Sequence, residues 1–352
     1  MNTELVTIDE KNIDDRAKDI LKRAGRIIKG GGLVAFPTET VYGLGGDALQ
    51  SESSKKIYAA KGRPSDNPLI VHVADMDSVS EIVDQVPEEA KKLAKAFWPG
   101  PLTMIMNKNE KVPYETTGGL DTVAIRMPDN RIALELIRQS SGFIAAPSAN
   151  TSGRPSPTLA RYCVEDLSGK IEMIIDGGQV GIGLESTIVD LTGEMPMILR
   201  PGYITRQMLE DVLGDVDIDR TIIDAASGVR PKAPGMKYRH YAPKGVLTIV
   251  EGTQEKVAQY INDKAREAQS EGKRVGVIGT DATKSLYIAD VVKSVGDRSD
   301  ESTIAHELFK VLREFDDESI DVMFSESFDD SGIGQAIMNR LLKAAGHRVV
   351  SL

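Results

Sequence analysis

The sequence is poor in the residues that several common sites require. A single cysteine, Cys163, among 352 residues excludes an internal disulfide bond and a cysteine zinc cluster. The four histidines lie far apart in the chain, so we do not expect a metal held by a histidine cluster; they are His72, His240, His306 and His347.

Long apolar runs and a targeting segment are also missing. No run approaches the roughly 20 residues that a membrane span needs. The start of the chain, residues 1–15, is acidic and polar, unlike a signal peptide with its basic start and apolar middle. Hydrophobic residues make up 41% and charged residues 27%, which is the balance of a globular protein. We therefore predict a cytoplasmic protein with no membrane association.

Positive charge is in deficit. The 43 Lys and Arg residues face 53 Asp and Glu residues, which gives a formal net charge of -10. A protein that wraps a long nucleic acid needs a continuous basic surface to neutralise phosphates. The composition therefore argues against a dedicated nucleic-acid module, although it is compatible with local basic pockets.

Familiar catalytic and phosphate-binding motifs are absent. The triplet Gly30–Gly32 lacks the Gly-Lys-Ser/Thr ending of a P-loop, and no Gly-x-Gly-x-x-Gly follows a strand at a helix start. The chain has no Gly-x-Ser-x-Gly elbow and no His-Glu-x-x-His. Motifs of these kinds therefore assign no function.

Helical and strand patterns alternate along most of the chain. Apolar residues at helical spacing over 13–29, followed by Gly30–Gly32, predict a helix and its end. Further helices are expected at 55–60 and 87–97, and strands at 33–36, 69–73, 102–106, 123–126, 143–146, 173–175, 187–191 and 197–199. Such alternation predicts an α/β fold with helices packed on a sheet.

A long stretch over 209–243 interrupts this alternation, and we predict that it links two domains. Its later part is rich in proline and glycine and lacks an apolar period. The first domain then spans 1–208 and the second 244–352. In the second, strands at 246–250, 275–278, 289–292 and 320–324 and helices at 253–268, 302–315 and 333–345 predict a small doubly wound α/β domain.

Polar residues gather where predicted strands end, which is where ligands bind in α/β sheets. The segments are 36–44, 61–68, Arg126 with Pro128, 145–156, 185–187 and 199–202. Each has a plain alternative in turn chemistry or solvated charge. A buried Arg126 needs a paired anion, which a substrate carboxylate or a structural Asp or Glu would supply equally well. Taken together, the segments predict one anion-binding pocket.

Two cations in the second segment suit a polyphosphate. If this proline-rich segment is extended, Lys61 and Arg63 lie on the same side. Two neighbouring cations repel each other unless an anion lies between them. Two solvated surface charges are the alternative.

Seven motifs then occur in one order: FPTETVYGLG, KGRP with DNPLIVH, WPGPLT, VAIRMP, APSANTSGRPSPT, GLESTIVD and ILRPG. This set resembles the L-threonylcarbamoyl-adenylate synthase family over residues 15–208. The resemblance continues through APGMKYRHYAP into the C-terminal domain of the long, two-domain branch. It implies condensation of L-threonine, bicarbonate and ATP to threonylcarbamoyl-AMP with release of pyrophosphate. A separate transferase would then move the threonylcarbamoyl group onto adenosine of certain tRNAs.

The resemblance also implies a set of site residues. The threonine pocket falls on Thr40, His72, Arg126, Ala146 and Ser186. The ATP contacts fall on Arg63, Asn67, Thr122, Ser148, Ser156, Arg200 and Tyr241. The family's spaced signatures, to which we assign catalysis, are Lys61 with Arg63 and Ser148 with Asn150. Mg²⁺ would ride on the ATP phosphates, and the fold would be a twisted, mostly open sheet with a large cavity and a smaller Rossmann-like C-terminal domain.

One hypothesis and two rival functions accompany this resemblance. The basic and aromatic segment 230–243 would fold over the pocket as a lid, with Tyr241 on the nucleotide; an exposed tether is the alternative. The rivals are a carbamoyl-transfer module and a non-enzymatic RNA-binding protein. Weak contact with tRNA is compatible with the synthase as well.

Overall fold

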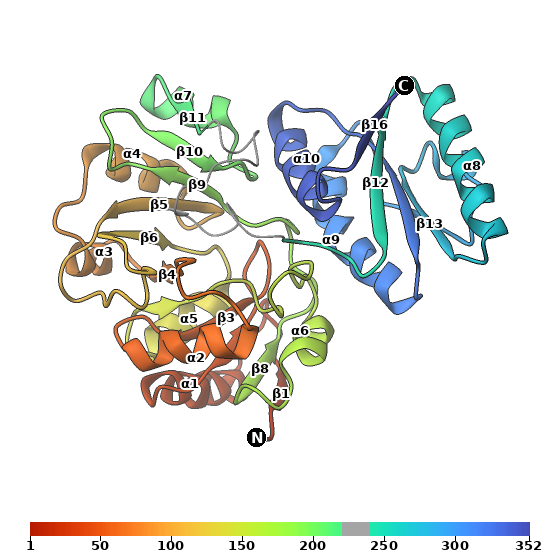
Figure 1. Ribbon diagram of the computed structural model, residues 1–352. Coiled ribbons are helices and arrows are strands. Elements are labelled where there is room, and N and C mark those ends of the chain that lie inside the picture. The colour runs from red at the N-terminus through yellow and green to blue at the C-terminus, as the bar shows by residue number, and fades with distance from the viewer. Residues whose placement is uncertain (220–239) are drawn as a thin grey trace. The chain divides into compact units, whose positions relative to one another are not determined.

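The computed structural model describes residues 1–219 and 240–352, which form two compact units. The first unit holds Met1–Ser152, Ser156–Gly181 and the described residues 185–219, coloured red to green in Figure 1. The second holds 240–352, teal to blue in Figure 1, together with the short segments Gly153–Pro155 and Ile182–Leu184.

A mixed sheet of eleven strands runs through residues 1–219 in the order β1-β8-β2-β3-β7-β4-β6-β5-β9-β10-β11. Its strands are β1 (Glu4–Thr7), β2 (Val34–Phe36), β3 (Gly43–Asp47), β4 (Ile70–His72), β5 (Leu102–Asn107), β6 (Thr122–Arg126), β7 (Ile144–Ala145), β8 (Met173–Asp176), β9 (Thr187–Asp190), β10 (Met197–Arg200) and β11 (Asp217–Ile218). Its helices are α1 (Asp15–Lys29), α2 (Ser51–Lys61), α3 (Asp77–Ile82), α4 (Glu88–Phe97), α5 (Arg131–Gln139), α6 (Ala160–Leu167) and α7 (Arg206–Leu213).

Helices α1 and α5 cover one face of this sheet. The Asp14 side chain caps α1 by accepting the Ala17 N–H at 2.8 Å. The buried face of α1 packs against α5 and against Val34 and Phe36 of β2. A Cβ on Gly25 would lie 2.3 Å from the Gln139 carbonyl oxygen, so the close approach of the two helices requires glycine.

The opposite face carries the larger core. Leu33 and Ala35 alternate with Val34 and Phe36. They belong to the larger core, to which α2, α3, α4, α6 and α7 contribute, whereas Val34 and Phe36 belong to the core of α1 and α5. This period of two is what a strand buried on both faces produces. Burying one such aliphatic side chain contributes about 1.5–3 kcal/mol, so the two layers together hold the sheet.

The second unit is a parallel sheet with helices on both faces. Within residues 240–352 the order is β14-β13-β15-β12-β16, and Figure 1 shows α8 on one side with α9 and α10 on the other. The elements are β12 (Val246–Glu251), α8 (Gln254–Ser270), β13 (Val275–Gly279), the 3-10 helix η2 (Lys284–Leu286), β14 (Val291–Ser294), α9 (Glu301–Asp317), β15 (Val322–Glu326), α10 (Gly332–Ala344) and β16 (Val349–Ser351). The predicted α/β class, with a Rossmann-like second domain, is confirmed.

The structure differs from the sequence prediction in several elements. Residues 209–213 belong to α7, and Asp217–Ile218 form the edge strand β11, although both were assigned to the linker. The glycine-rich run 43–47, where no strand was predicted, is a central strand. Residues 220–239 of the predicted linker lie outside the described residues. Of the helices within 1–219 and 240–352, none combines the length and apolar character that a bilayer crossing requires.

Candidate active site

Four polar side chains form a row at one edge of the first sheet. His72 ends β4 and Arg126 ends β6, and the strand ladder pairs both His72 and Thr103 with Arg126. The hydroxyl of Ser186, just before β9, lies 2.7 Å from that of Thr103. Because side chains alternate along strands, this row shares a face with buried Ile70, Ile105, Ala124 and Ile188. The ladder thus fixes a polar row beside an apolar floor.

The loop between β2 and β3 brings a carboxylate to this row. The Thr38 hydroxyl accepts the backbone N–H of Thr40 at 3.2 Å and of Val41 at 3.3 Å, and donates to the Val41 carbonyl oxygen at 2.6 Å. Oε2 of Glu39 lies 2.8 Å from Nη2 of Arg126. We did not predict Glu39 as a site residue, although a carboxylate between two threonines at a strand end was visible in the sequence.

His72 is a neutral member of the row. Burial lowers the pKa of His72 to about 3, and the neighbouring Arg126 charge acts in the same direction. Its Nδ1 lies 3.1 Å from the Ile70 carbonyl oxygen, and its ring meets Phe36 edge-on at 6.2 Å. The imidazole therefore adds no positive charge beside Arg126 at neutral pH.

Arg200 extends the row to β10. Its Nε donates to the Ser186 carbonyl oxygen at 3.0 Å, and its Nη2 to the Ser186 hydroxyl at 3.2 Å. A Cβ on Gly202 would lie 2.4 Å from the Thr187 backbone nitrogen, so the Arg-Pro-Gly motif needs its glycine where the two segments pass. Arg200, which we predicted to bind the nucleotide, thus contacts Ser186, which we predicted to bind the threonine substrate.

Lys61, Ser148 and Asn150 form a second cluster. Nζ of Lys61 donates to the carbonyl oxygen of Asn150 at 2.5 Å and to that of Ser148, and the Ser148 hydroxyl donates to Oδ1 of Asn150 at 2.5 Å. The expectation that Lys61 lies in an extended segment is wrong, because α2 continues through Lys61 and ends at Gly62 in the left-handed conformation. Carbonyl oxygens bind the buried ammonium group that we expected to need a polyphosphate.

Arg63 and Asn67 meet in the next turn. The Arg63 guanidinium donates to the carbonyl oxygens of Asn67 at 3.3 Å and of Pro68 at 3.0 Å. The Asn67 side chain is buried, and its Oδ1 accepts no hydrogen bond from any described residue. This acceptor is open to a donor on a ligand.

The remaining predicted residues are spread over both units. Thr122 starts β6 on the face that carries Arg126, about 13 Å away along the strand. The Ser156 hydroxyl donates to Oε1 of Glu185 at 2.5 Å, and the Ala146 N–H donates to the Ile70 carbonyl oxygen at 2.8 Å. Tyr241 belongs to the second unit. It has a positive φ of 62°, and its ring stacks on Phe309 at 5.0 Å.

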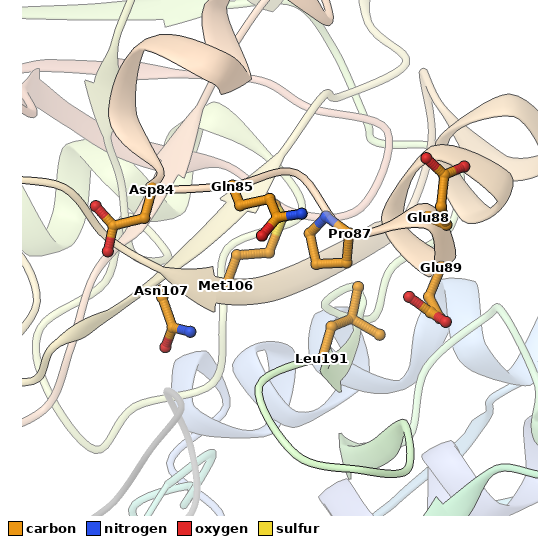
Figure 2. Close-up of a pocket in the computed structure, with 8 residues that line it drawn as sticks. All are labelled: Asp84, Gln85, Pro87, Glu88, Glu89, Met106, Asn107 and Leu191. Carbon is orange, nitrogen blue, oxygen red and sulfur yellow. The ribbon is translucent and has the colours of Figure 1, made fainter.

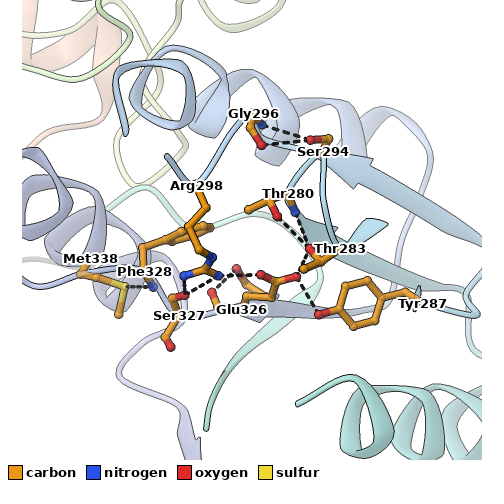
Figure 3. Close-up of polar contacts among 11 residues, drawn as sticks. Thr280, Thr283, Tyr287, Ser294, Gly296, Arg298, Glu326, Ser327, Phe328 and Met338 are labelled. Atoms are coloured by element: carbon orange, nitrogen blue, oxygen red, sulfur yellow. Dashed lines mark hydrogen bonds and ion pairs between the residues drawn. The ribbon is translucent and has the colours of Figure 1, made fainter. Parts of the chain in front are cut away.

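Two cavities contain none of the predicted site residues. One of about 440 Å³ lies in the first unit, and Figure 2 shows the carboxylates of Asp84, Glu88 and Glu89 around it. Its lining contains no Lys or Arg, which makes it a poor site for a polyphosphate. The other, of about 240 Å³, lies in the second unit beside Arg298 and Glu326, which Figure 3 shows in a hydrogen-bonded network.

The fold is that of an α/β protein, and the row of polar side chains at the strand ends is a candidate site for a polar ligand. The family described as "Telomere recombination" matches residues 26–202, and the one described as "Threonylcarbamoyl-AMP synthase, C-terminal domain" matches 204–346. The threonylcarbamoyl-AMP synthase of Pyrococcus abyssi is 48% identical, covering 97% of this chain and 98% of its own length. That of Bacillus subtilis is 49% identical and covers 94% of both chains.

A solved structure agrees with these relatives. The crystal structure of P. abyssi Sua5 complexed with L-threonine has 47% identity and a TM-score of 0.93, covering 99% of this chain and 100% of that one. The chain belongs to the threonylcarbamoyl-AMP synthase family. The resemblance drawn from the seven motifs is confirmed.

Proposed function

We propose that the chain condenses L-threonine, bicarbonate and ATP into L-threonylcarbamoyl-AMP, with release of pyrophosphate and water. The full-length similarity to threonylcarbamoyl-AMP synthases supports this function. Within the structure, the observation that carries it is Arg126, a guanidinium buried at a strand end with open hydrogen-bonding nitrogens. The product would serve a downstream transferase that modifies adenosine in tRNA.

In this proposal the amino acid lies over the strand-edge row. Arg126 binds its carboxylate, because a guanidinium edge matches a carboxylate with two parallel hydrogen bonds. Thr40 and Ser186 offer buried hydroxyls, His72 offers a neutral imidazole, and Ala146 leaves room for the ligand backbone. The apolar floor suits the threonine methyl group.

The nucleotide extends from this row toward Thr122, Asn67 and the Ser148 loop. Arg63 and Arg200 neutralise phosphate charge. The hydroxyl protons of Ser148 and Ser156 are donated to Asn150 and Glu185, so these two hydroxyl oxygens act as hydrogen-bond acceptors for the nucleotide. Lys61 acts by holding the carbonyl oxygens of Ser148 and Asn150, which fixes the loop under the phosphates. Rigid donors of this kind stabilise developing charge without reorganisation during the reaction.

The chemistry requires no nucleophile from the protein. The threonine ammonium group first loses a proton to solvent. The resulting amine nitrogen forms the bond to the bicarbonate carbon, with loss of water, and a carbamate oxygen then forms the bond to the α-phosphorus. The bond from that phosphorus to the bridging oxygen breaks, and pyrophosphate leaves with the electron pair. The site contributes positioning and charge stabilisation.

We assign Mg²⁺ to the ATP phosphates. Residues 1–219 and 240–352 contain no group of three or more His, Cys, Asp or Glu side chains arranged to hold a metal ion. The proposed site includes a carboxylate, Glu39, and an imidazole, His72, and its other polar groups are mainly guanidinium groups, amides and hydroxyls. Mg²⁺ carried on phosphates needs few protein ligands and would supply charge neutralisation.

The lid role of 230–243 stays a hypothesis, since most of this segment lies outside the described residues. Tyr241 packs on Phe309, and its predicted contact with the nucleotide stays a prediction. Deleting residues 231–243 should abolish formation of the adenylate or speed its hydrolysis. Unchanged kinetics after the deletion would refute the lid.

The test of function is pyrophosphate release by the full chain with ATP, Mg²⁺ and bicarbonate, with and without L-threonine. We expect threonine-dependent release that is lost in Arg63→Ala. If folded, ATP-binding protein released no pyrophosphate, the carbamoyl-transfer and RNA-binding functions would gain weight. Salt-dependent tRNA binding would then separate those two.

A further inference from the structure

One edge of the Arg126 guanidinium is buried and unused. Nε and Nη2 lie side by side on this edge, and neither donates a hydrogen bond to any residue that the structure describes. Arg126 is 4% exposed, so bulk water does not replace the missing partners. This edge is the one that binds a carboxylate with two parallel hydrogen bonds.

Glu39 is close to this edge without being hydrogen-bonded to it. Its Oε2 lies 2.8 Å from Nη2 of Arg126, and the side chain is 12% exposed. Both carboxylate oxygens are nevertheless buried without a hydrogen-bond partner among the described residues. The pair neutralises its charges and leaves acceptors and donors unused.

The surrounding groups do not take over this role. Thr40 and Thr103 bond to the hydroxyls of Thr38 and Ser186, respectively. Arg200 is bound to Ser186, and the buried His72 ring is uncharged at neutral pH. A buried polar group left unmatched costs about 1–3 kcal/mol, so native proteins rarely keep several together without a purpose. Unmatched groups of both charges at one place fit a ligand that carries both charges.

We propose that Glu39 binds the ammonium group of the amino-acid substrate and serves as the counter-ion of Arg126 while the pocket is empty. The substrate carboxylate takes the open edge of Arg126, and its ammonium group takes the carboxylate of Glu39. One ion pair is exchanged for two, and the net charge of the site is unchanged. This assignment rests on the proposed function and names the group that distinguishes an α-amino acid from a simple hydroxy acid.

The test compares two ligands that differ at one position. L-Threonine carries the ammonium group, and (R)-3-hydroxybutyrate is the same molecule without it. Isothermal titration of the full chain should show that wild type prefers threonine. In Glu39→Gln the ratio of the two affinities should fall at least about tenfold, because threonine loses its ammonium partner. Hydroxybutyrate should bind more tightly than it does to wild type, because Arg126 has lost its internal counter-ion.

The matched control is Glu326→Gln, which removes the charge from another buried glutamate paired with an arginine. It should keep the wild-type ratio. Glu39→Asp retains the charge and should give an intermediate ratio, which covers the case in which Glu39→Gln does not fold. A wild-type ratio in a folded Glu39→Gln chain would overturn the assignment and leave the proposed function standing. Absence of threonine binding by wild type would instead overturn the proposed function, and this assignment with it.

Discussion

Each unit pairs a largely buried glutamate with an arginine near a strand end, and the two pairs differ in how completely they are hydrogen-bonded. The Arg126 side chain is buried as well, whereas that of Arg298 is 49% exposed. In the second unit, Oε2 of Glu326 accepts from Arg298 at 2.6 Å, and Oε1 accepts from Tyr287 at 2.7 Å and from Thr283 (Figure 3). Arg298 also donates to the Ser327 carbonyl oxygen at 3.0 Å from two nitrogens. Both oxygens of the Glu326 carboxylate therefore accept hydrogen bonds from residues of the same unit.

The pair in the first unit, Arg126 with Glu39, has a similar separation of 2.8 Å, but its hydrogen bonding is incomplete. Strand ends predict ligand sites in both units, and a cavity of about 240 Å³ lies beside the completed pair. The difference shows that a cavity at a strand end does not by itself identify a ligand site. A ligand site also has hydrogen-bond donors and acceptors that the protein does not use. We therefore interpret Glu326 and Arg298 as a structural ion pair, and Glu39 and Arg126 as part of a substrate-binding site.

The largest expected effect separates the two arginines by activity. Arg126→Gln should lower kcat/KM for L-threonine about 100- to 1,000-fold, because a buried carboxylate loses its charged partner. Arg298→Gln should leave kcat/KM within about twofold. Pyrophosphate release at varied threonine concentration measures both values of kcat/KM. Equal losses would contradict the distinction between a substrate-binding pair and a structural pair.

The next effect separates the two glutamates by whether a ligand rescues them. Removing Glu39 from the buried pair costs about 3 kcal/mol or more, since Arg126 is left uncompensated. Removing the charge of Glu326 costs less, because water solvates the half-exposed Arg298. Hydrogen exchange should show faster opening near β6 in Glu39→Gln and near β15 in Glu326→Gln. Saturating (R)-3-hydroxybutyrate should restore protection in the first variant and not in the second. Rescue of both, or of neither, would contradict the comparison.

The sequence predicted much of this fold because apolar period and strand-end chemistry are local signals. The helix at 13–29 and the strands that end in His72 and Arg126 are visible as patterns. Strand β3 is not, because Gly43, Gly45 and Gly46 carry no strand preference. It forms by pairing with β2 and β7, and the Phe36 ring and Ile144 occupy the space that a side chain at Gly45 would take.

Pairing across the sheet was the information that the sequence lacked. Arg126 was predicted to face either a substrate carboxylate or a structural acid, and the structure places Glu39 there. Lys61 was expected beside a phosphate, and its carbonyl partners lie 87 and 89 residues away in the chain. Such long-range contacts depend on strand order, which no local pattern encodes.

A smaller effect concerns the neutral histidine beside the open pair. Its pKa is about 3 in the folded chain and 6.5 in the unfolded one, so between these values the unfolded state binds the extra proton. Stability should therefore fall as pH drops below 6.5, with a slope of at most about 1.4 kcal/mol per pH unit from this residue. Urea unfolding from pH 7 to pH 5 should give a shallower loss in His72→Gln than in wild type. Parallel curves would mean that a charged His72 is tolerated beside Arg126.

The smallest effect comes from a third pair, which tests whether distance alone carries the energy. Nε of Arg206 lies 2.7 Å from Oε1 of Glu210 on α7, between the distances of the other two pairs. Neither side chain is buried here, since they are 50% and 28% exposed. Water screens such a pair, so a double-mutant cycle with Arg206→Ala and Glu210→Ala should give a coupling of about 0.3–0.5 kcal/mol that fades with salt. A coupling as large as that of the Arg126–Glu39 pair would mean that the distance between the charges governs the energy. The small value would leave two properties that distinguish the three pairs: the burial of the glutamate and the completeness of its hydrogen bonding.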